Sequence, residues 1–412
     1  MKNSFFINYF LGLIIIISFI FGLVISENSS GGAANDAISI LNNSKLFNSY
    51  LLHEVPWDKY KSTSLPLFYI LNKLLFSEIE FIDLVLTNVF FSVLIFIFFF
   101  LTLKTKFSIN KIEKSYLFLL SSIVLLSPYL RSSTFWGIEE IIGIFFFILT
   151  LFFYEKYKSN KIFLYQILCL LSASLALFSR QSYIFLIIFF FFKFFNFKNF
   201  FGKKNISIIF LLFVFNIPSL YFFYIWKGLL PPMAQEQRGL SFNLIHVPFI
   251  LSILFVYFIP TILLNLNGLK DCKTFFKKYF IYIILISMSF FAFIFLSDLN
   301  TIGGGAFLKI LYLINLNKFF LSLFISIFSG IFLIYLIFYF ETKIKIFFLL
   351  IISIFSTIDL IFQEYFDPIS FLAINIMFLS SSIKSYKFHR YIYFSLAYYS
   401  AFLIGSIYYY SL

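Results

Sequence analysis

The sequence predicts an all-α polytopic membrane protein that forms one domain over residues 1–412. Hydrophobic residues make up 61% of the chain and the mean hydropathy is +0.98, whereas about 45–50% of a soluble domain is apolar. Uninterrupted apolar runs of about 17–25 residues recur along the whole length, and each can cross a ~30 Å hydrocarbon core as a helix. No segment has the composition of a separate soluble domain.

The apolar runs predict thirteen membrane spans. Placing Met1 in the cytoplasm puts most of the 31 Lys and Arg residues in or beside the inner loops, as the positive-inside rule requires. The first run is interpreted as a retained helix and not as a signal peptide, because many more runs follow it. The predicted spans are 5–26, 81–103, 115–131, 138–154, 162–179, 182–198, 206–226, 244–266, 279–297, 318–340, 346–362, 367–383 and 391–411.

The charged residues divide between the two sides of the membrane. Most of the 18 Asp and Glu residues lie in the outer loops, so the polar chemistry is expected to face outward. The net charge of +13 then reflects topology and gives no support to a nucleic-acid partner. Only Asp359 falls within a span, near its outer half, which argues against an ion-coupled channel or carrier. Cys169 and Cys272 lie in different compartments, so no disulfide or cysteine metal site is expected.

The longest outer loop, residues 27–80, carries a dense cluster of polar residues that includes His53, Glu54 and Asp58. A short interfacial amphipathic helix is predicted from Asn35 or Asp36 onward. Asp36 is either the N-cap of this helix or a functional carboxylate. The short apolar segment 62–76 predicts a second interfacial or re-entrant helix. The apolar positions of the first helix, spaced by three and four, are Ala37, Ile38, Ile40, Leu41 and Leu46.

Three of the four arginines lie on the outer side, where positive charge is otherwise sparse. A guanidinium group binds phosphate or carboxylate at two points, whereas Lys is a point charge. A lipid phosphate on this side would explain the bias, and the alternative is that each Arg pairs with a nearby Glu such as Glu139. The candidate phosphate-binding cations are Arg131, Arg180 and Arg238, with Lys227 and His246 in the loop that carries Arg238.

The first outer loop resembles that of the GT-C superfamily, membrane glycosyltransferases that use polyprenyl-phosphate sugars. The resemblance is closest to the dolichyl-phosphate-glucose α-1,2-glucosyltransferase family, in which an Asp is followed about twenty positions later by Trp-Asp, a Thr pair, Pro and Tyr. The chain departs from that pattern at Ala37, where the family has a second acid, and in lacking a Gly after the Pro. The matching residues are Asp36, Trp57, Asp58, Thr63, Ser64, Pro66 and Tyr69.

Three later motifs are collinear with the same family. Arg180, Gln181 and Ser182 resemble its Arg-Gln-Thr-Asn motif. His246 and Pro248 resemble its His-x-Pro, at the start of a later span. Its late Glu/Arg-Tyr-Phe-Pro element is matched in this chain, without the Arg, by Glu364, Tyr365, Phe366 and Pro368.

The resemblance implies an inverting sugar transfer from a lipid-phosphate donor to a glycan or lipid-linked acceptor. It assigns the general base to Asp36, with Asp58 or Glu54 as the fallback, and the leaving phosphate to the cations named above. Trp57, Gln181, Tyr69 and Glu364 are the expected substrate-binding residues, although Trp57 and Tyr69 are also typical of an interfacial aromatic belt. No cofactor is assigned, and the lipid-phosphate sugar is a substrate. His53, Glu54 and Asp58 are not assigned as a metal-ligand set, because their spacing is unspecific.

Two other functions fit a chain of many spans. A polysaccharide polymerase or ligase of the O-antigen type would place its largest outer loop in the middle or late chain, whereas here that loop is first. A lipid-linked oligosaccharide flippase would show repeated halves and a charged central cavity. The richness in Lys, Asn, Ile and Phe indicates an AT-rich genome, so we expect the bacterial inner membrane with a periplasmic site. In a eukaryote the same topology would predict the endoplasmic reticulum.

Overall fold

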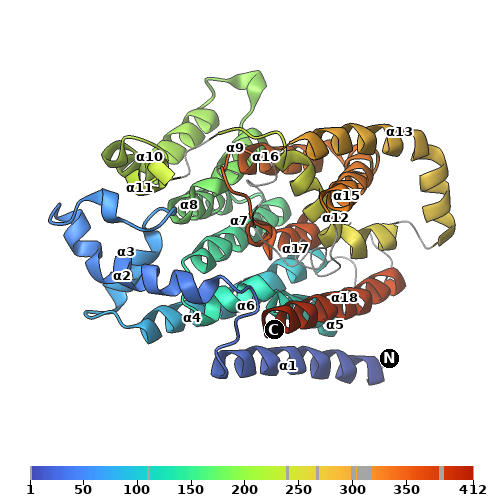
Figure 1. Ribbon diagram of the computed structural model, residues 1–412, viewed down its shortest axis with the longest axis horizontal. Helices are drawn as coiled ribbons and strands as arrows, with labels where there is room; N and C mark the ends of the chain where they lie inside the picture. Colours follow the sequence, from blue (N-terminus) through green and yellow to red (C-terminus); the bar gives the residue numbers. More distant parts are fainter. Residues whose placement is uncertain are drawn as a thin grey trace.

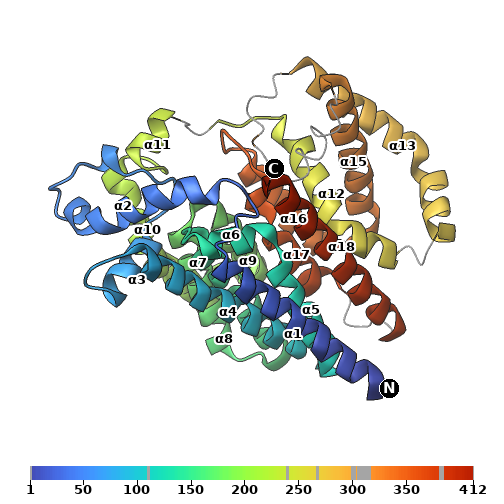
Figure 2. The same ribbon diagram turned by 60° about the horizontal axis from the view of Figure 1, so that its bottom comes forward.

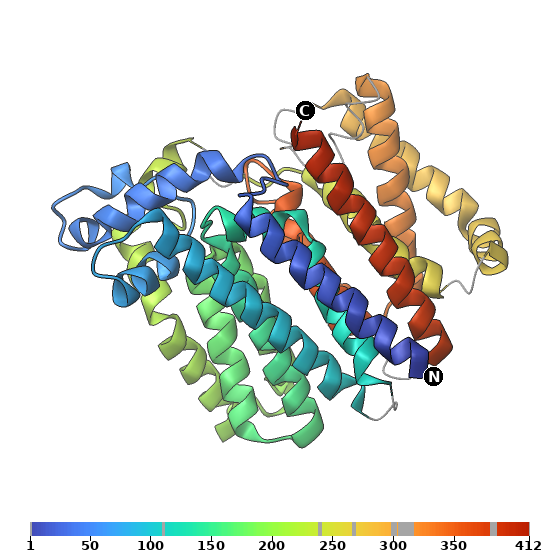
Figure 3. The same ribbon diagram turned by 90° about the horizontal axis from the view of Figure 1, so that it is seen from below.

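The computed structural model describes residues 2–108, 112–237, 241–265, 269–297, 303, 317–379 and 385–411, and within these ranges the chain is helical and has no β-strand. Figure 1 shows the helices packed as a single bundle. Figure 3 shows α1 (Lys2–Val24) and α18 (Ser385–Ser411) side by side. Tyr393 of α18 donates a hydrogen bond to Asn8 of α1 at 2.7 Å. The first and last described helices therefore pack against each other.

Among the described residues, six helices are long and apolar enough to cross a membrane, so the chain is a multi-pass membrane protein. The six are α1, α4 (Phe81–Lys106), α10 (Lys203–Trp226), α12 (His246–Asn265), α13 (Leu269–Leu296) and α15 (Lys318–Tyr339). Each carries a strongly apolar window, and in α1, α4, α10 and α13 less than half of that window is buried inside the protein. Such exposed apolar faces match a hydrocarbon solvent.

The predicted count of thirteen spans is not confirmed. The predicted span 115–131 is broken into α5 (Lys114–Ser122), η3 (Ile123–Leu126) and α6 (Pro128–Phe135), with a bend of 65°. Proline lacks a backbone N–H and displaces the preceding residue from helical geometry, so Pro128 explains the break. The span predicted at 367–383 is also irregular. In its described part, up to Leu379, the chain forms α17 (Ile369–Ala373) after Pro368 at the N-cap, followed by the π-helical turn η7 (Ile374–Phe378).

The other predicted spans are helices of varied length. They are α7 (Glu140–Asn160), α8 (Phe163–Ser179), α9 (Ile184–Phe194) and α16 (Thr342–Phe355), together with α18. At about 1.5 Å per residue, the 17 residues of α8 extend about 25 Å. This helix is shorter than the ~30 Å core that its composition predicts it to cross.

The segment predicted as the first outer loop is folded. It contains α2 (Ala33–Leu51), the 3₁₀ turn η1 (Trp57–Lys59) and α3 (Leu67–Leu75). Figure 2 shows α2 and α3 on the side of the bundle where α10 and α11 (Pro232–Gln237) lie. The N-cap of α2 is Gly32, so the alternative reading of Asp36 as the N-cap is wrong. Asp36 lies in the first turn of the helix.

A small aromatic core holds this segment against α10. The Trp57 ring stacks on Tyr50 with 5.3 Å between centroids and meets Trp226 of α10 edge-on at 5.9 Å. Tyr60 and Tyr69 are fully buried beside them. The belt interpretation of Trp57 and Tyr69 is therefore wrong, because both rings lie inside the protein.

We expect Trp57→Ala to lower the free energy of unfolding by roughly 3–5 kcal/mol, because it empties the centre of this aromatic core. Thermal or denaturant unfolding of the protein in detergent micelles measures the change. Leu74→Ala is the control, since Leu74 is 78% exposed and should change stability by less than about 0.5 kcal/mol. Equal losses in the two variants would contradict a packed core around Trp57.

Candidate functional site

Two adjoining hollows form the candidate site. The larger, which we call the polar cavity, has a volume of about 540 Å³ and is lined by parts of α2, α7, α11, α18, η6 (Gln363–Phe366) and the stretch 60–64. The smaller, the apolar pocket, has a volume of about 200 Å³. Thr63, Arg180 and Tyr365 line both, so the two hollows share a boundary. The apolar pocket is lined mainly by Leu177, Ile184, Phe223, Leu229, Ile354 and Ile358.

The first turns of α2 form one wall of the polar cavity. Asp36 and Ser39 both line it, and residues three apart lie on the same face of a helix. The positive end of the helix dipole favours a carboxylate at the position of Asp36. The structure therefore brings the predicted base into a cavity with a predicted phosphate-binding group, Arg180.

Arg180 follows the last residue of α8, where the backbone becomes extended before η4 (Gln181–Tyr183). Its Nη1 donates to Oε1 of Glu140, in the first turn of α7. The guanidinium carbon lies 4.3 Å from the centroid of the Tyr365 ring, in a cation–π contact. These two contacts hold the positive charge at the boundary between the two hollows.

Glu139, the N-cap residue of α7, also lines the polar cavity. It accepts hydrogen bonds from the Ser62 hydroxyl at 2.8 Å and from the Tyr69 hydroxyl. Burial raises the pKa of this carboxyl above its usual value, and the hydrogen bonds from Ser64, Tyr69 and Ser62 and the charge of Arg180 oppose that effect. Tyr69 does not line the cavity, but it contacts a residue that does.

Sequence reasoning did not assign a role to several residues of the polar cavity. The sequence suggests Glu139 only as an ion-pair partner of an arginine and gives no role to Glu140 or Lys61. The consecutive acids at the start of a helix and the serines beside Lys61 were the available signals. The formally charged side chains of the cavity are Asp36, Lys61, Glu139, Glu140, Arg180 and Glu364.

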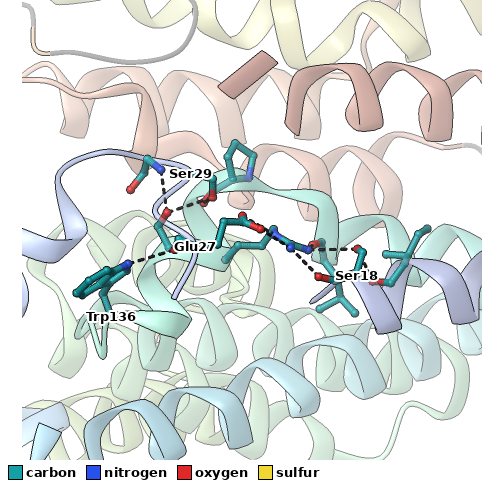
Figure 4. A network of polar contacts seen from close by, with 10 residues as sticks. Ser18, Glu27, Ser29 and Trp136 are labelled. Atoms are coloured by element: carbon teal, nitrogen blue, oxygen red, sulfur yellow. Dashed lines mark hydrogen bonds and ion pairs between the residues drawn. The ribbon is translucent and has the colours of Figure 1, made fainter. Parts of the chain in front are cut away.

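Arg131 lies elsewhere. Its Nε and Nη2 donate to the two carboxylate oxygens of Glu27 at 2.8 and 2.6 Å, and both side chains are buried. Figure 4 shows Glu27 in this polar network, with Ser18 and Trp136. The guanidinium is saturated by protein groups and does not line either hollow. We therefore place no substrate at Arg131.

Five other predicted residues also lie away from the two hollows, and one of them is Trp57, in the aromatic core. Glu54 and Asp58 are exposed, and so is Lys227, which caps the end of α10 in a left-handed conformation. His246 is fully buried at the start of α12. Arg238 lies outside the described residues.

Gln181 and Glu364 do line the hollows. Gln181 lies in the apolar pocket and donates to the backbone oxygen of Leu229 at 3.1 Å. Glu364 lies in the polar cavity. Within the described residues, no group of three or more His, Cys, Asp or Glu side chains is placed to hold a metal ion.

No protein-family model, curated protein or solved structure matches this chain. Any functional conclusion therefore rests on the geometry and chemistry of the two hollows.

The raised pKa of Glu139 predicts a pH dependence of stability. The folded state holds this proton more tightly than the unfolded chain, in which the pKa of a Glu is about 4.3. The resulting stabilisation is complete below about pH 4.3 and is lost as the pH rises through the raised value. The melting temperature of the wild type, measured in detergent, should therefore fall relative to that of Glu139→Gln as the pH rises from about 4.3 through the raised pKa. Glu54→Gln, at an exposed site, is the control, and the same slope in wild type and Glu139→Gln would contradict the effect.

Proposed function

We propose that the protein is a membrane glycosyltransferase that moves a sugar from a polyprenyl-phosphate donor to a hydroxyl of a glycan or lipid-linked acceptor. One observation carries the proposal. A polar cavity that contains a carboxylate on a helix N-terminus shares Arg180, Tyr365 and Thr63 with an apolar pocket. An amphiphilic donor has matching parts, because its sugar is polar, its phosphate is anionic and its chain is hydrocarbon.

The boundary between the hollows suits the donor phosphate. Arg180 donates a hydrogen bond to Glu140 through Nη1, and a guanidinium has five N–H donors in all. The apolar pocket offers Leu177, Ile184 and Phe223 to the first isoprenoid units. Lys61, on the rim of the polar cavity, supplies a second positive charge. A phosphate at this boundary therefore meets cations on one side and keeps its chain out of water.

The reaction is a single displacement. Asp36 takes the proton of the acceptor hydroxyl as that oxygen forms a bond to the anomeric carbon. The bond between the anomeric carbon and the phosphate oxygen breaks, and its electron pair leaves with the polyprenyl phosphate. Arg180 and Lys61 stabilise the charge that develops there. Attack opposite the leaving group inverts the anomeric configuration.

The remaining carboxylates suit a sugar. Glu139 and Glu364 present oxygens to the polar cavity, and carboxylate oxygens accept hydrogen bonds from sugar hydroxyls. In this proposal the shorter helices α8 and α9 also cross the membrane, in a GT-C-like bundle with α2 and α3 at the interface. Met1 lies in the cytoplasm and the two hollows face the periplasm. Glucose is the first donor sugar to test, because it is the donor of the family that the motifs resemble.

Asp36→Asn should reduce sugar transfer by roughly 10²–10⁴-fold, because it removes the proton acceptor while keeping the shape of the side chain. The assay follows transfer from a panel of polyprenyl-phosphate sugars to extracted lipid and glycan acceptors. Asp58→Asn is the matched variant, since Asp58 is an exposed carboxylate outside the cavity.

Two results would contradict this assignment. Full transfer by Asp36→Asn would reject Asp36 as the base, and a selective loss in Asp58→Asn would move the base to Asp58. Absence of transfer by the wild type from every donor in the panel would reject the proposed function and favour a polymerase or a flippase.

Arg180→Lys should lower kcat/KM for the lipid donor roughly 10–100-fold, because a hydrogen bond to a charged group is worth about 1.5–3 kcal/mol and Lys lacks the fork. Steady-state kinetics over donor concentration measure the change. Lys227→Ala removes a cation that lies outside both hollows and should leave kcat/KM nearly unchanged. Equal effects in the two variants would indicate a general influence of positive charge and not a phosphate site.

A further inference from the structure

Residues 27–31, in the chain between α1 and α2, are held against α6 by the middle residues of the segment. We call this segment the linker. Ser29 is fully buried, and its hydroxyl donates to the backbone oxygen of Pro128 at 2.8 Å. The Ser132 hydroxyl lies 3.1 Å from that of Ser29 and accepts the backbone N–H of Ser30 at 2.8 Å. Since the Ser29 proton is used on Pro128, Ser132 is the donor between the two hydroxyls.

The start of the linker is fixed to the same helix. The Glu27 carboxylate receives both donors of the Arg131 fork, and its backbone oxygen accepts the indole N–H of Trp136 at 3.1 Å (Figure 4). Arg131 belongs to α6 and Trp136 directly follows it. The short helix α6 and the residue after it therefore hold the linker through the side chains of Arg131, Ser132 and Trp136.

The middle and the end of the linker also contact α18. The Ser406 hydroxyl donates to the backbone oxygen of Ser29 at 2.6 Å. Gly31 has a φ of +81°, a conformation that side chains rarely adopt, and a Cβ there would collide with the ring of Tyr410. Tyr410 itself lines the polar cavity.

The linker leads directly into the helix that carries the proposed base. Gly32 is the N-cap of α2, and the backbone N–H of Asp36 donates to its oxygen at 3.3 Å. Only Gly32 lies between the fixed linker and the first turn of α2. A shift of the linker would therefore move Asp36 relative to Arg180, which is held separately by Glu140 and Tyr365.

We propose that Glu27, Ser29 and Ser132 are positioning residues that fix the start of α2 and hold Asp36 in the polar cavity. This inference rests on the proposed function, in which Asp36 is the base. These residues do not line the cavity and do not touch the substrate. They act through the backbone that joins the linker to α2.

Ser132→Ala tests the role of the α6 hydroxyl. The loss of its two linker contacts should lower kcat roughly 10–100-fold, because a displacement of about 1 Å can cost about 10²-fold in rate. The donor KM should stay within about twofold, since Arg180 and the apolar pocket are untouched. Ser92→Ala is the matched control. Ser92 is also fully buried and bonds a hydroxyl of α6, that of Thr134 at 2.7 Å, but it makes no contact with the linker.

A second measurement does not depend on activity. Ser39→Cys places a thiol on the cavity face of α2, in a Cys272→Ser background in which the buried Cys169 remains. Adding Ser132→Ala should change the rate of thiol labelling by a charged reagent several-fold, and adding Ser92→Ala should not.

The outcomes separate the two proposals. Unchanged labelling and unchanged kcat in Ser132→Ala would overturn the positioning role while leaving the transferase function in place. Equal losses in Ser132→Ala and Ser92→Ala would overturn it as well, because they would show general destabilisation. If the wild type transfers no sugar from any donor, the proposed function falls, and the labelling rates still decide whether the linker positions α2.

Discussion

The ion pair between Glu27 and Arg131 is the interaction on which the arrangement around the site depends. Both side chains are taken out of water, and the cost of that transfer is recovered only when the geometry is good and the remaining donors are satisfied. Both conditions hold, because the fork is bidentate and Nη2 also donates to the backbone oxygen of Ser18 at 2.8 Å. Gly22 of α1 provides the space for this pair, because a Cβ at that position would collide with both side chains. Removing one partner would strand a buried charge, at a cost of about 3–5 kcal/mol.

The pair is possible because α6 is short and sharply turned. Ser127 precedes a proline, so it leaves helical geometry and ends the preceding turn. Its hydroxyl then accepts the backbone N–H of Leu130 at 3.0 Å and caps the new helix. After the bend of 65°, α6 presents Arg131 to α1, Ser132 to the linker and Thr134 to α4. A straight continuation of α5, as composition predicts here, would carry the whole segment in another direction and take these three side chains away from their neighbours.

The sequence predicts those parts of the fold that depend on local composition. Hydropathy finds the helices that are long and apolar, and the amphipathic spacing finds α2, although two or three residues late at its start. The sequence motifs also identify Asp36 and Arg180, which the structure places in one cavity. The pairing of Arg131 could not be predicted in the same way. Its partner is 104 residues away, and a carboxylate nearer in sequence, Glu139, bonds Ser62 and Tyr69 instead.

Burial was the second property that sequence reasoning could not supply. Trp57 and Tyr69 have the composition of belt aromatics, and only the packing of α2 and α10 makes them a core. Conversely, Glu54 and Asp58 lie in the densest charged stretch of the chain but face outward from η1 and the turn before it. Residue type indicates what chemistry is available, whereas the tertiary fold decides which side chains share a solvent-shielded space.

The position of Arg180 has a consequence for turnover in the proposed reaction. A guanidinium beside an apolar pocket needs a compensating charge, and Glu140 provides it while the site is empty. The donor phosphate is a diester with one negative charge, whereas the polyprenyl phosphate that leaves is a monoester with a charge of up to about −2 at neutral pH. Arg180 alone would therefore bind the product more tightly than the donor. Glu140 competes for the same guanidinium and repels the more charged ligand more strongly, so the ion pair favours release of the product and its replacement by a new donor.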